Sequence, residues 1–393
     1  MKKYLIPSLL FAICAISSCF GHSATYLAAG VSLGLIITPG DITFNVNEVR
    51  SFTEGISETM FKNPDFESMH TIVEDIVAGN QIAYFGLLSK ITRADSGCSA
   101  SVTSTGNVPT DEQFWAPEKT EIFLSECLGD NYDATFLIYL QEKGIKRDDW
   151  TATDLYTFLL GRVESAAAED LWRIVWFNDK DAANVDDSPA GVITTGVELK
   201  DYNIINGFWK KIYTIVSGDA TKRVTISLNA EATYAAQAFD STDTSNHLVM
   251  GILQDMIEAA DPRMIDQTGL EFWVTTTMYN QLKREYKSYS NIEASYMSNI
   301  NGVPTLTFDG YPVRQINFWD RTIKADLNDG AAYYQPHRAI FSTKTNFLVG
   351  VDSKSSLTQS DVWYSKDTRK NNILMKYKVD AVIRENSMFV AAY

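Results

Sequence analysis

The sequence is poor in the residues that most often bind metals or act as catalysts. It contains four histidines and four cysteines among 393 residues. It has no H-E-x-x-H, Walker A or G-x-G-x-x-G motif, which would indicate a zinc protease, a nucleotide phosphate site or a dinucleotide site. His70 has no second ligand residue four positions away, and His22 lies in the N-terminal leader. His247 falls in the first turn of a predicted helix, where a structural or exposed role is favoured, and His337 opens a strand with no Ser or Cys nucleophile nearby. We therefore predict no catalytic, cofactor-binding or metal-binding residues and no enzymatic activity.

Basic residues are also scarce. The chain has 34 lysines and arginines against 49 aspartates and glutamates, which gives a net charge of −15. A protein whose main ligand is DNA or RNA needs a basic surface that neutralises phosphates. The charge balance therefore argues against nucleic-acid binding as the primary role and favours an acidic soluble surface.

The cysteines form no recognisable metal or redox motif. Cys14 and Cys19 lie in the leader, so only Cys98 and Cys127 remain for the fold. Their spacing matches neither a zinc site nor a C-x-x-C pair. They can pair as a disulfide or stay as two buried thiols in a reducing compartment, and the second interpretation is favoured.

No apolar run is long enough to span a bilayer. The run from Tyr4 to Ile16 follows two lysines and precedes Ser17-Ser18-Cys19, which resembles a lipoprotein cleavage box. The apolar residues 26–37 contain a G-x-S-x-G match at residues 30–34, but no strand precedes it as a nucleophile elbow requires. Residues 1–40 are therefore interpreted as a leader-like segment that is not part of the fold.

The remaining sequence is typical of a globular protein, with 45% hydrophobic and 12% aromatic residues. Its length fits two or three domains of about 150 residues. Residues 67–79 place Met69, Ile72, Val73 and Ile76 at helical spacing and predict a helix that ends at Gly79. Residues 93–113 are rich in Ser, Thr, Gly and Asp and predict a long loop that is functional or reaches a partner. Residues 118–127 predict a strand.

Residues 151–177 predict the clearest helix. Thr151 and Asp154 approximate a capping box, and a single apolar stripe runs along the segment. Such a helix would be about 35–40 Å long and would suit an element lying across a sheet, with a coiled-coil seam as the alternative. The acidic residues 178–187 predict a solvated turn, with weak Ca²⁺ binding as a second interpretation, because the spacing is not that of an EF-hand.

The second half of the chain predicts both strands and helices. It predicts a strand at 223–230, a helix at 245–263 stopped by Pro262, a strand at 270–275 and then a helix. Asp309-Gly310 predicts a two-residue hairpin that pairs Phe308 with Tyr311, with Pro312 tolerated if its strand has a free outer edge. Two short strands at 337–352 and a long half-buried strand from Ile373 to Ile383 precede the last strand, "MFVAAY". No repeat is evident, and the fold class is α+β.

Four stretches in this order resemble the major capsid proteins of tailed bacteriophages, which share the Hong-Kong-ninety-seven fold. They are "LEFWVTTTMYNQL", "TLTFDGYPVRQINFW", the segment that ends in Asn346-Phe347-Leu348-Val349-Gly350, and "ILMKYKVDAVIRENSMFVAAY". The resemblance covers residues 41–393 and is strongest after residue 200. It implies a structural subunit that self-assembles into an icosahedral head and encloses DNA.

The resemblance also implies a domain organisation. Residues 41–92 correspond to an N-terminal arm and residues 93–126 to an extended loop that reaches a neighbouring subunit. Residues 127–187 and 301–393 correspond to a peripheral domain with the spine helix at 151–177, and residues 188–300 to an axial domain. The implied partners are the protein itself, as pentamers and hexamers, with scaffold, portal and decoration proteins. DNA contact would be non-specific, membrane contact absent, and the location the virion, assembled in the host cytoplasm.

Two other hypotheses belong to different classes. An exported outer-membrane lipoprotein would be lipidated at Cys19 and would bind a ligand such as carbohydrate on its aromatic residues. An acidic hydrolase would use two close carboxylates, for example Glu231 with Asp240 or Glu258 with Asp261.

Overall fold

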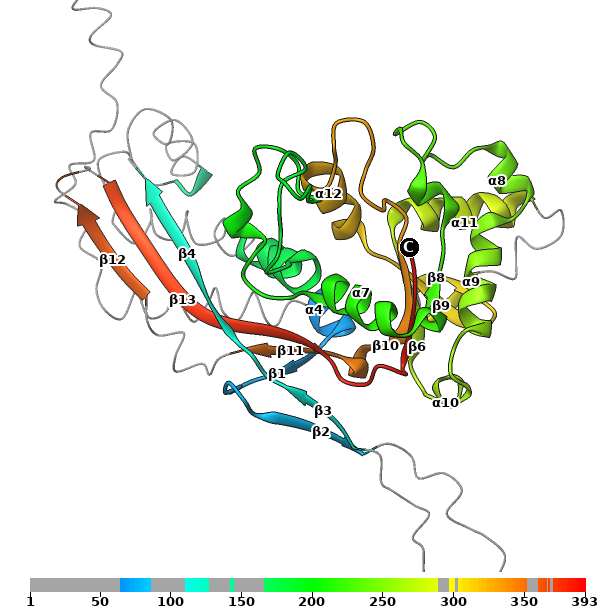
Figure 1. The fold of residues 1–393 in the computed structure, drawn as a ribbon, viewed down its shortest axis with the longest axis horizontal. Coiled ribbons are helices and arrows are strands. Elements are labelled where there is room, and N and C mark those ends of the chain that lie inside the picture. The colour runs from blue at the N-terminus through cyan, green and yellow to red at the C-terminus, as the bar shows by residue number, and fades with distance from the viewer. Residues whose placement is uncertain are drawn as a thin grey trace, which may run out of the picture. The chain divides into compact units, whose positions relative to one another are not determined.

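The computed structural model describes residues 64–85, 110–126, 142–144, 166–288, 297–300, 303–351, 360–365, 367 and 370–393. Helices and strands are mixed along them, so the predicted α+β class is confirmed (Figure 1). The chain divides into a smaller unit (residues 1–49, 123–162 and 361–374) and a larger unit (residues 50–122, 163–360 and 375–393). Most of the described residues belong to the larger unit. None of the helices they form is long and apolar enough to cross a membrane.

A seven-stranded sheet forms the centre of the larger unit. Strand β10 pairs antiparallel with β14 and with β6, and β6 pairs parallel with β9. Side chains pack on both faces, because Phe272 stacks on Phe341 while the neighbouring Trp273 contacts Trp176. This explains why β6 is apolar at every position except Glu271, without alternation. In order across the sheet the strands are β5 (Arg223–Val224), β14 (Phe389–Ala392), β10 (Ala339–Thr343), β6 (Leu270–Val274), β9 (Tyr311–Gln315), β8 (Val303–Phe308) and β7 (Met297–Ile300).

Helices α9 (Leu248–Glu258) and α11 (Thr276–Ser288) pack against this sheet through one hydrophobic core. The first turn of α9 lacks a side-chain cap of its own, because His247 precedes it in a left-handed conformation with φ 54°. The buried carboxylate of Glu285 in α11 instead accepts hydrogen bonds from the Val249 and Met250 N–H groups, each at 2.9 Å. One helix therefore caps the other. Two short helices lie nearby in the sequence, α8 (Ser241–Ser245) and α10 (Pro262–Ile265).

A cluster of large aromatic side chains fills a second part of the core. It joins the helix at residues 166–177 to α7 (Phe208–Gly218) and α12 (Asn317–Asp326). Trp176 lies at its centre, with ring centroids 4.8 Å from Trp319 and 4.9 Å from Phe208. All three rings are fully buried, so burial of aromatic area holds these helices together.

A second sheet is built around strand β13 (Lys370–Ile383). In the larger unit, β1 (Thr71–Val73) pairs parallel with β11 (Phe347–Val351), and β11 pairs antiparallel with β13 from Val379 to Ile383. Strands β12 (Ser360–Ser365) and β4 (Glu118–Glu126) also pair with β13. Helix α4 (Pro64–Met69) precedes β1, and short 3₁₀ turns are η2 (Leu199–Asp201), η3 (Ala220–Lys222), η4 (Ser227–Ala230) and η5 (Lys344–Asn346).

The hairpin prediction is confirmed. Phe308 pairs with Tyr311 and Thr307 with Pro312. The loop residues Asp309 and Gly310 have φ angles of 48° and 83°, as a type I′ turn requires. The strand of Pro312 has no free outer edge, because β6 pairs with β9. That pairing begins at Phe272 with Val313, so the proline lies just before the ladder.

The predicted helix at residues 67–79 is wrong. Helix α4 ends at Met69, and Ile72 and Val73 lie in β1. The β-branched run pairs with β11, and a left-handed residue, Asp75 at φ 62°, follows it. Strand pairing therefore overrides the helical spacing of the apolar residues.

Two boundaries in the second half also differ from the prediction. Of residues 223–230 only Arg223–Val224 form a strand, and residues 227–230 form a 3₁₀ turn. Helix α9 ends at Glu258, and Pro262 does not stop it but begins α10, where Asp261 caps the turn. A proline suits this first helical position because its missing N–H would have no partner there.

Several predictions fall outside the described residues. These are the leader with its G-x-S-x-G match, residues 41–63 and 86–92 of the arm, Cys98 and Cys127, residues 93–109 of the long loop, and residues 151–165 of the long helix. Within the long helix, residues 166–177 are helical as expected.

Candidate functional site

A two-stranded ribbon leaves the second sheet next to β1. Strands β2 (Gln81–Phe85) and β3 (Thr110–Phe114) pair antiparallel over five residue pairs (Figure 1). Among the described residues neither strand pairs with any other strand. The Phe114 side chain is 53% exposed. A lone two-stranded ribbon is marginally stable in water, so these strands are suited to packing against another surface.

The root of the ribbon is held by apolar packing. Trp115, which follows β3, is only 5% exposed and packs with Ile76, Leu348 and Val382. Its indole lies over Gly350 of β11, where any added Cβ would overlap the ring at 2.5 Å. The backbone of Trp115 also closes the ribbon, with its C=O accepting from the Gly79 N–H at 2.9 Å.

A buried carboxylate fixes the residue after Trp115. Asp380 of β13 is 3% exposed, and its Oδ2 accepts a hydrogen bond from the Ala116 N–H at 2.8 Å. Its Oδ1 lies 3.5 Å from the Lys211 Nζ of α7. Burial lowers the pKa of Lys211, and the Asp380 charge opposes that shift. The ribbon root, β13 and α7 are thus joined through one carboxylate.

Further ion pairs lie in the same unit as the Asp380–Lys211 pair. Lys180 Nζ lies 2.5 Å from Glu118 at the start of β4. The acidic turn at residues 178–187 also contributes, because Lys210 of α7 contacts Asp179 at 2.8 Å and Asp181 at 3.2 Å. These carboxylates are therefore engaged by lysine. Among the described residues no group of three or more His, Cys, Asp or Glu could hold a metal ion.

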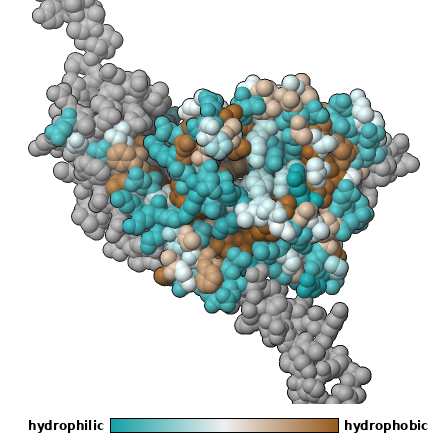
Figure 2. Space-filling model, viewed as in Figure 1, coloured by the Kyte–Doolittle hydropathy of each residue, from teal (hydrophilic) through white to brown (hydrophobic). Residues whose placement is uncertain are grey.

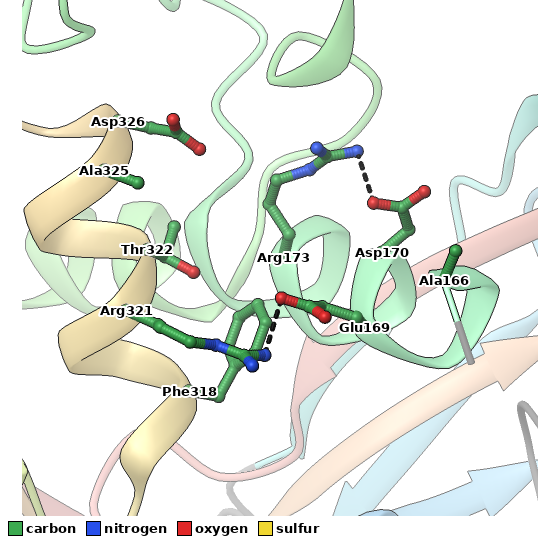
Figure 3. Close-up of a pocket in the computed structure, with 9 residues that line it drawn as sticks. All are labelled: Ala166, Glu169, Asp170, Arg173, Phe318, Arg321, Thr322, Ala325 and Asp326. Atoms are coloured by element: carbon green, nitrogen blue, oxygen red, sulfur yellow. Dashed lines mark ion pairs between the residues drawn. The ribbon is translucent and has the colours of Figure 1, made fainter. Parts of the chain in front are cut away.

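A pocket of about 360 Å³ opens between the helix at residues 166–177 and α12 (Figure 3). Two ion pairs flank it, Glu169–Arg321 at 2.5 Å and Asp170–Arg173 at 3.0 Å. Burial raises the pKa of Asp170, and the Arg173 charge acts in the opposite direction. Nine residues line the pocket: Ala166, Glu169, Asp170, Arg173, Phe318, Arg321, Thr322, Ala325 and Asp326.

Two described histidines, His70 and His337, are buried packing residues. His70 is buried, accepts a hydrogen bond from the Trp176 indole at 3.0 Å and contacts the Phe66 carbonyl at 2.9 Å. Burial lowers its pKa to about 3, so it stays neutral. The ring nitrogens of buried His337 lie 2.6 Å from the Gln237 carbonyl and 2.9 Å from the Thr277 hydroxyl, and burial lowers its pKa to about 4.

Three of the four carboxylates named for a hydrolase, Asp240, Glu258 and Asp261, have local roles. Asp240 caps α8, and Asp261 caps α10 while it binds the Arg263 guanidinium. The hydrogen bonds from Arg263 lower the pKa of Asp261 to about 2. Glu258 accepts from the Gln254 amide at 3.1 Å. These contacts give no indication of an acid and base pair.

Sequence reasoning missed the ribbon root. The alternation from Ile373 to Ile383 predicts that Asp380 faces solvent, but the structure buries it under Ala116. The pair of Trp115 and Gly350 is separated by more than 200 residues, and no local pattern connects them. The one available signal was an acidic residue in an otherwise apolar stretch, "VDAVI".

Solved structures similar to this chain include capsids and procapsids of phages. A chain in a structure of the satellite phage P4 procapsid with its size determination protein aligns over 86% of this chain and 98% of its own length, at 8% identity and a TM-score of 0.46. For Mycobacterium phage Che8 the coverages are 80% and 84%, the identity 10% and the TM-score 0.41. For the capsid of a native GTA particle they are 85% and 89%, with 13% identity and a TM-score of 0.38. No protein-family model and no curated protein matches the sequence.

Proposed function

We propose that the chain is a major capsid protein, a structural subunit that self-assembles into the icosahedral head of a tailed phage or prophage and encloses its DNA. The observation that carries this proposal is the β2–β3 ribbon, which is anchored at its root but has unpaired outer edges among the described residues. Subunits of a closed shell contact their neighbours through surfaces that become buried only on assembly. A two-stranded ribbon with unpaired edges provides such a surface.

The order of the resembling stretches supports the same function. "LEFWVTTTMYNQL" forms β6 and α11, and "TLTFDGYPVRQINFW" forms β8, β9 and the start of α12. The later stretches form β10, β11, β13 and β14. We assign β2 to the N-terminal arm at residues 41–92, β3 to the extended loop at residues 93–126, the helix at residues 166–177 to the spine helix at 151–177, and residues 188–300 to the axial domain.

The surface and the net charge fit a hydrated subunit that encloses DNA. On the face drawn in Figure 2, hydrophilic residues cover most of the described surface, and hydrophobic residues form separate patches between them. An acidic subunit repeated many times would repel packaged DNA and allow it to slide, so DNA contact would be non-specific. The partners would be other copies, as pentamers and hexamers, with scaffold, portal and decoration proteins joining them in the host cytoplasm.

Negative-stain microscopy and sedimentation of the purified chain, with and without residues 1–40, test the proposal. We expect pentamers, hexamers or closed shells. The variant Phe114→Ser should assemble only at higher concentration with an unchanged monomer melting temperature, and Asp255→Asn on the exposed face of α9 is the control. A monodisperse monomer at high concentration would overturn the proposal, and lipidated Cys19 with membrane fractionation would favour the lipoprotein hypothesis instead.

A further inference from the structure

The pocket between the helix at residues 166–177 and α12 contains one carboxylate without a cation. Glu169 and Asp170 each pair with an arginine, whereas Asp326 accepts only the Tyr202 hydroxyl, at 2.5 Å from its Oδ2. No cation among the described residues forms an ion pair with Asp326. Its backbone position strengthens the negative potential, because Asp326 ends α12, where the helix dipole is also negative.

A second polar group in the pocket has no partner. The Thr322 side chain points from α12 into the space between the two helices (Figure 3). Thr322 is only 6% exposed, and its hydroxyl has no hydrogen-bond partner among the described residues. The hydroxyl oxygen is therefore open to the pocket, where a ligand that supplies a donor can bind it.

The rest of the pocket suits an aliphatic chain. Phe318, Ala166 and Ala325 provide apolar surface beside the two polar groups. A ligand with a hydrocarbon stem and a cationic head would cover this surface with its stem and reach Asp326 and Thr322 with its head.

The chemistry distinguishes lysine from arginine. An arginine prefers both oxygens of a carboxylate, and the Tyr202 hydroxyl already occupies one acceptor site of the Asp326 Oδ2, which leaves Oδ1 as the more open oxygen. Burial and this hydrogen bond raise the pKa of Tyr202, which therefore remains a donor. A compact ammonium needs only one carboxylate oxygen and can share its remaining donors with Thr322.

We propose that this pocket binds a lysine side chain of a second copy of the chain, with its ammonium on Asp326 and Thr322. The choice of a second copy rests on the proposed assembly of identical subunits, and the net charge of the pocket, three carboxylates against two guanidiniums, fits a cationic occupant. Contact would occur wherever two subunits bring this helix pair together.

Carbodiimide crosslinking of the assembled full chain tests the proposal directly. The reagent joins a carboxylate to a lysine amine in contact with it, and a mixture of ¹⁴N- and ¹⁵N-labelled chains separates crosslinks between copies from those within one copy. We expect mass spectrometry to find Asp326 joined to a lysine of a differently labelled copy. This crosslink should disappear in Asp326→Asn and persist in the control Asp255→Asn.

Assembly measurements supply the second readout. Asp326→Asn keeps an acceptor for Tyr202 but removes the charge, and we expect the concentration needed for assembly to rise about 10-fold, as loss of one half-buried ion pair predicts. Thr322→Val should raise it by a smaller factor. An unchanged concentration in Asp326→Asn, or crosslinks at Asp326 only within single copies, would overturn the lysine pocket.

The outcomes also separate this inference from the proposed function. Closed shells without any Asp326 crosslink between copies would overturn the pocket and leave the capsid function standing. Asp326-dependent dimers that never form larger rings or shells would support the pocket and overturn the capsid function. A wild-type chain that stays monomeric would overturn both.

Discussion

The indole of Trp115 lies against the backbone of Gly350, so close that a Cβ at position 350 would fall 2.5 Å from the ring atom Cζ3. The same Cβ would meet the Ile76 side chain at 2.7 Å. Glycine at this position therefore allows the ribbon root to pack on β11, which connects the protruding strands to the core.

Replacing this glycine tests the packing. Gly350→Ala should lower the free energy of unfolding by ~1–3 kcal/mol, because an overpacked site forces its neighbours to shift. The matched control is Gly251→Ala in α9, where no atom lies within 4 Å of the added Cβ. That change should stabilise the protein by up to ~1 kcal/mol. Urea unfolding of both variants measures the difference, and equal effects would contradict the close contact.

The second prediction concerns the ion pair between Lys211 and Asp380. Lys211→Met removes the cation beside a carboxylate that is only 3% exposed, and should cost ~1–3 kcal/mol because a buried charge loses its partner. Asp380→Asn alone should also destabilise the fold, but the double variant should recover part of the loss. A double-mutant cycle by urea unfolding gives the coupling. Strict additivity of the two single changes would show that the pair is not coupled.

The third prediction concerns Glu285 of α11, whose carboxylate caps the first turn of α9. Glu285→Ala leaves the Val249 and Met250 N–H groups without their acceptor and should cost ~1–3 kcal/mol. Glu258→Ala, at the exposed end of α9, should change stability by less than ~0.5 kcal/mol. Thermal unfolding of the two variants compares them, and a loss from Glu258→Ala as large as that from Glu285→Ala would contradict the capping role.

The buried histidines make a prediction about pH. The pKa of His70 is lowered to about 3, so below the unfolded pKa near 6.5 the unfolded chain binds a proton that the folded chain does not. Stability should then fall as pH falls from about 6.5 toward 3, by up to ~1.4 kcal/mol per pH unit for each such histidine. His337, with a pKa lowered to about 4, acts in the same direction.

Urea unfolding of wild type and His70→Gln between pH 6 and pH 4.5 isolates the contribution of His70 to the pH dependence of stability. The variant has nothing to titrate at position 70, so its unfolding free energy should depend less steeply on pH than that of wild type. Parallel pH profiles for the two proteins would mean that His70 is not held neutral by the fold.

Local patterns predicted the elements that depend on local chemistry. Asp309-Gly310 fixed the hairpin because only residues that tolerate positive φ form a type I′ turn. The alternation in β13 and the apolar run in β6 also predicted strands correctly. By contrast, Ile72 and Val73 have helical spacing yet lie in β1, because they pair with β11. This partner strand is more than 270 residues away in the sequence, so no local pattern could predict the pairing.

The sequence by itself determined the class of the fold, the acidic surface, and the turns and strands that follow from backbone preference and alternation. Only the tertiary structure decided that Asp380 is buried, that Trp115 needs Gly350, and that Asp326 and Thr322 meet in one pocket whose two arginines pair with other carboxylates. The physical reason is that burial and electrostatic pairing are set by residues that are distant in the chain and adjacent in space. Composition and periodicity report only on neighbours along the chain.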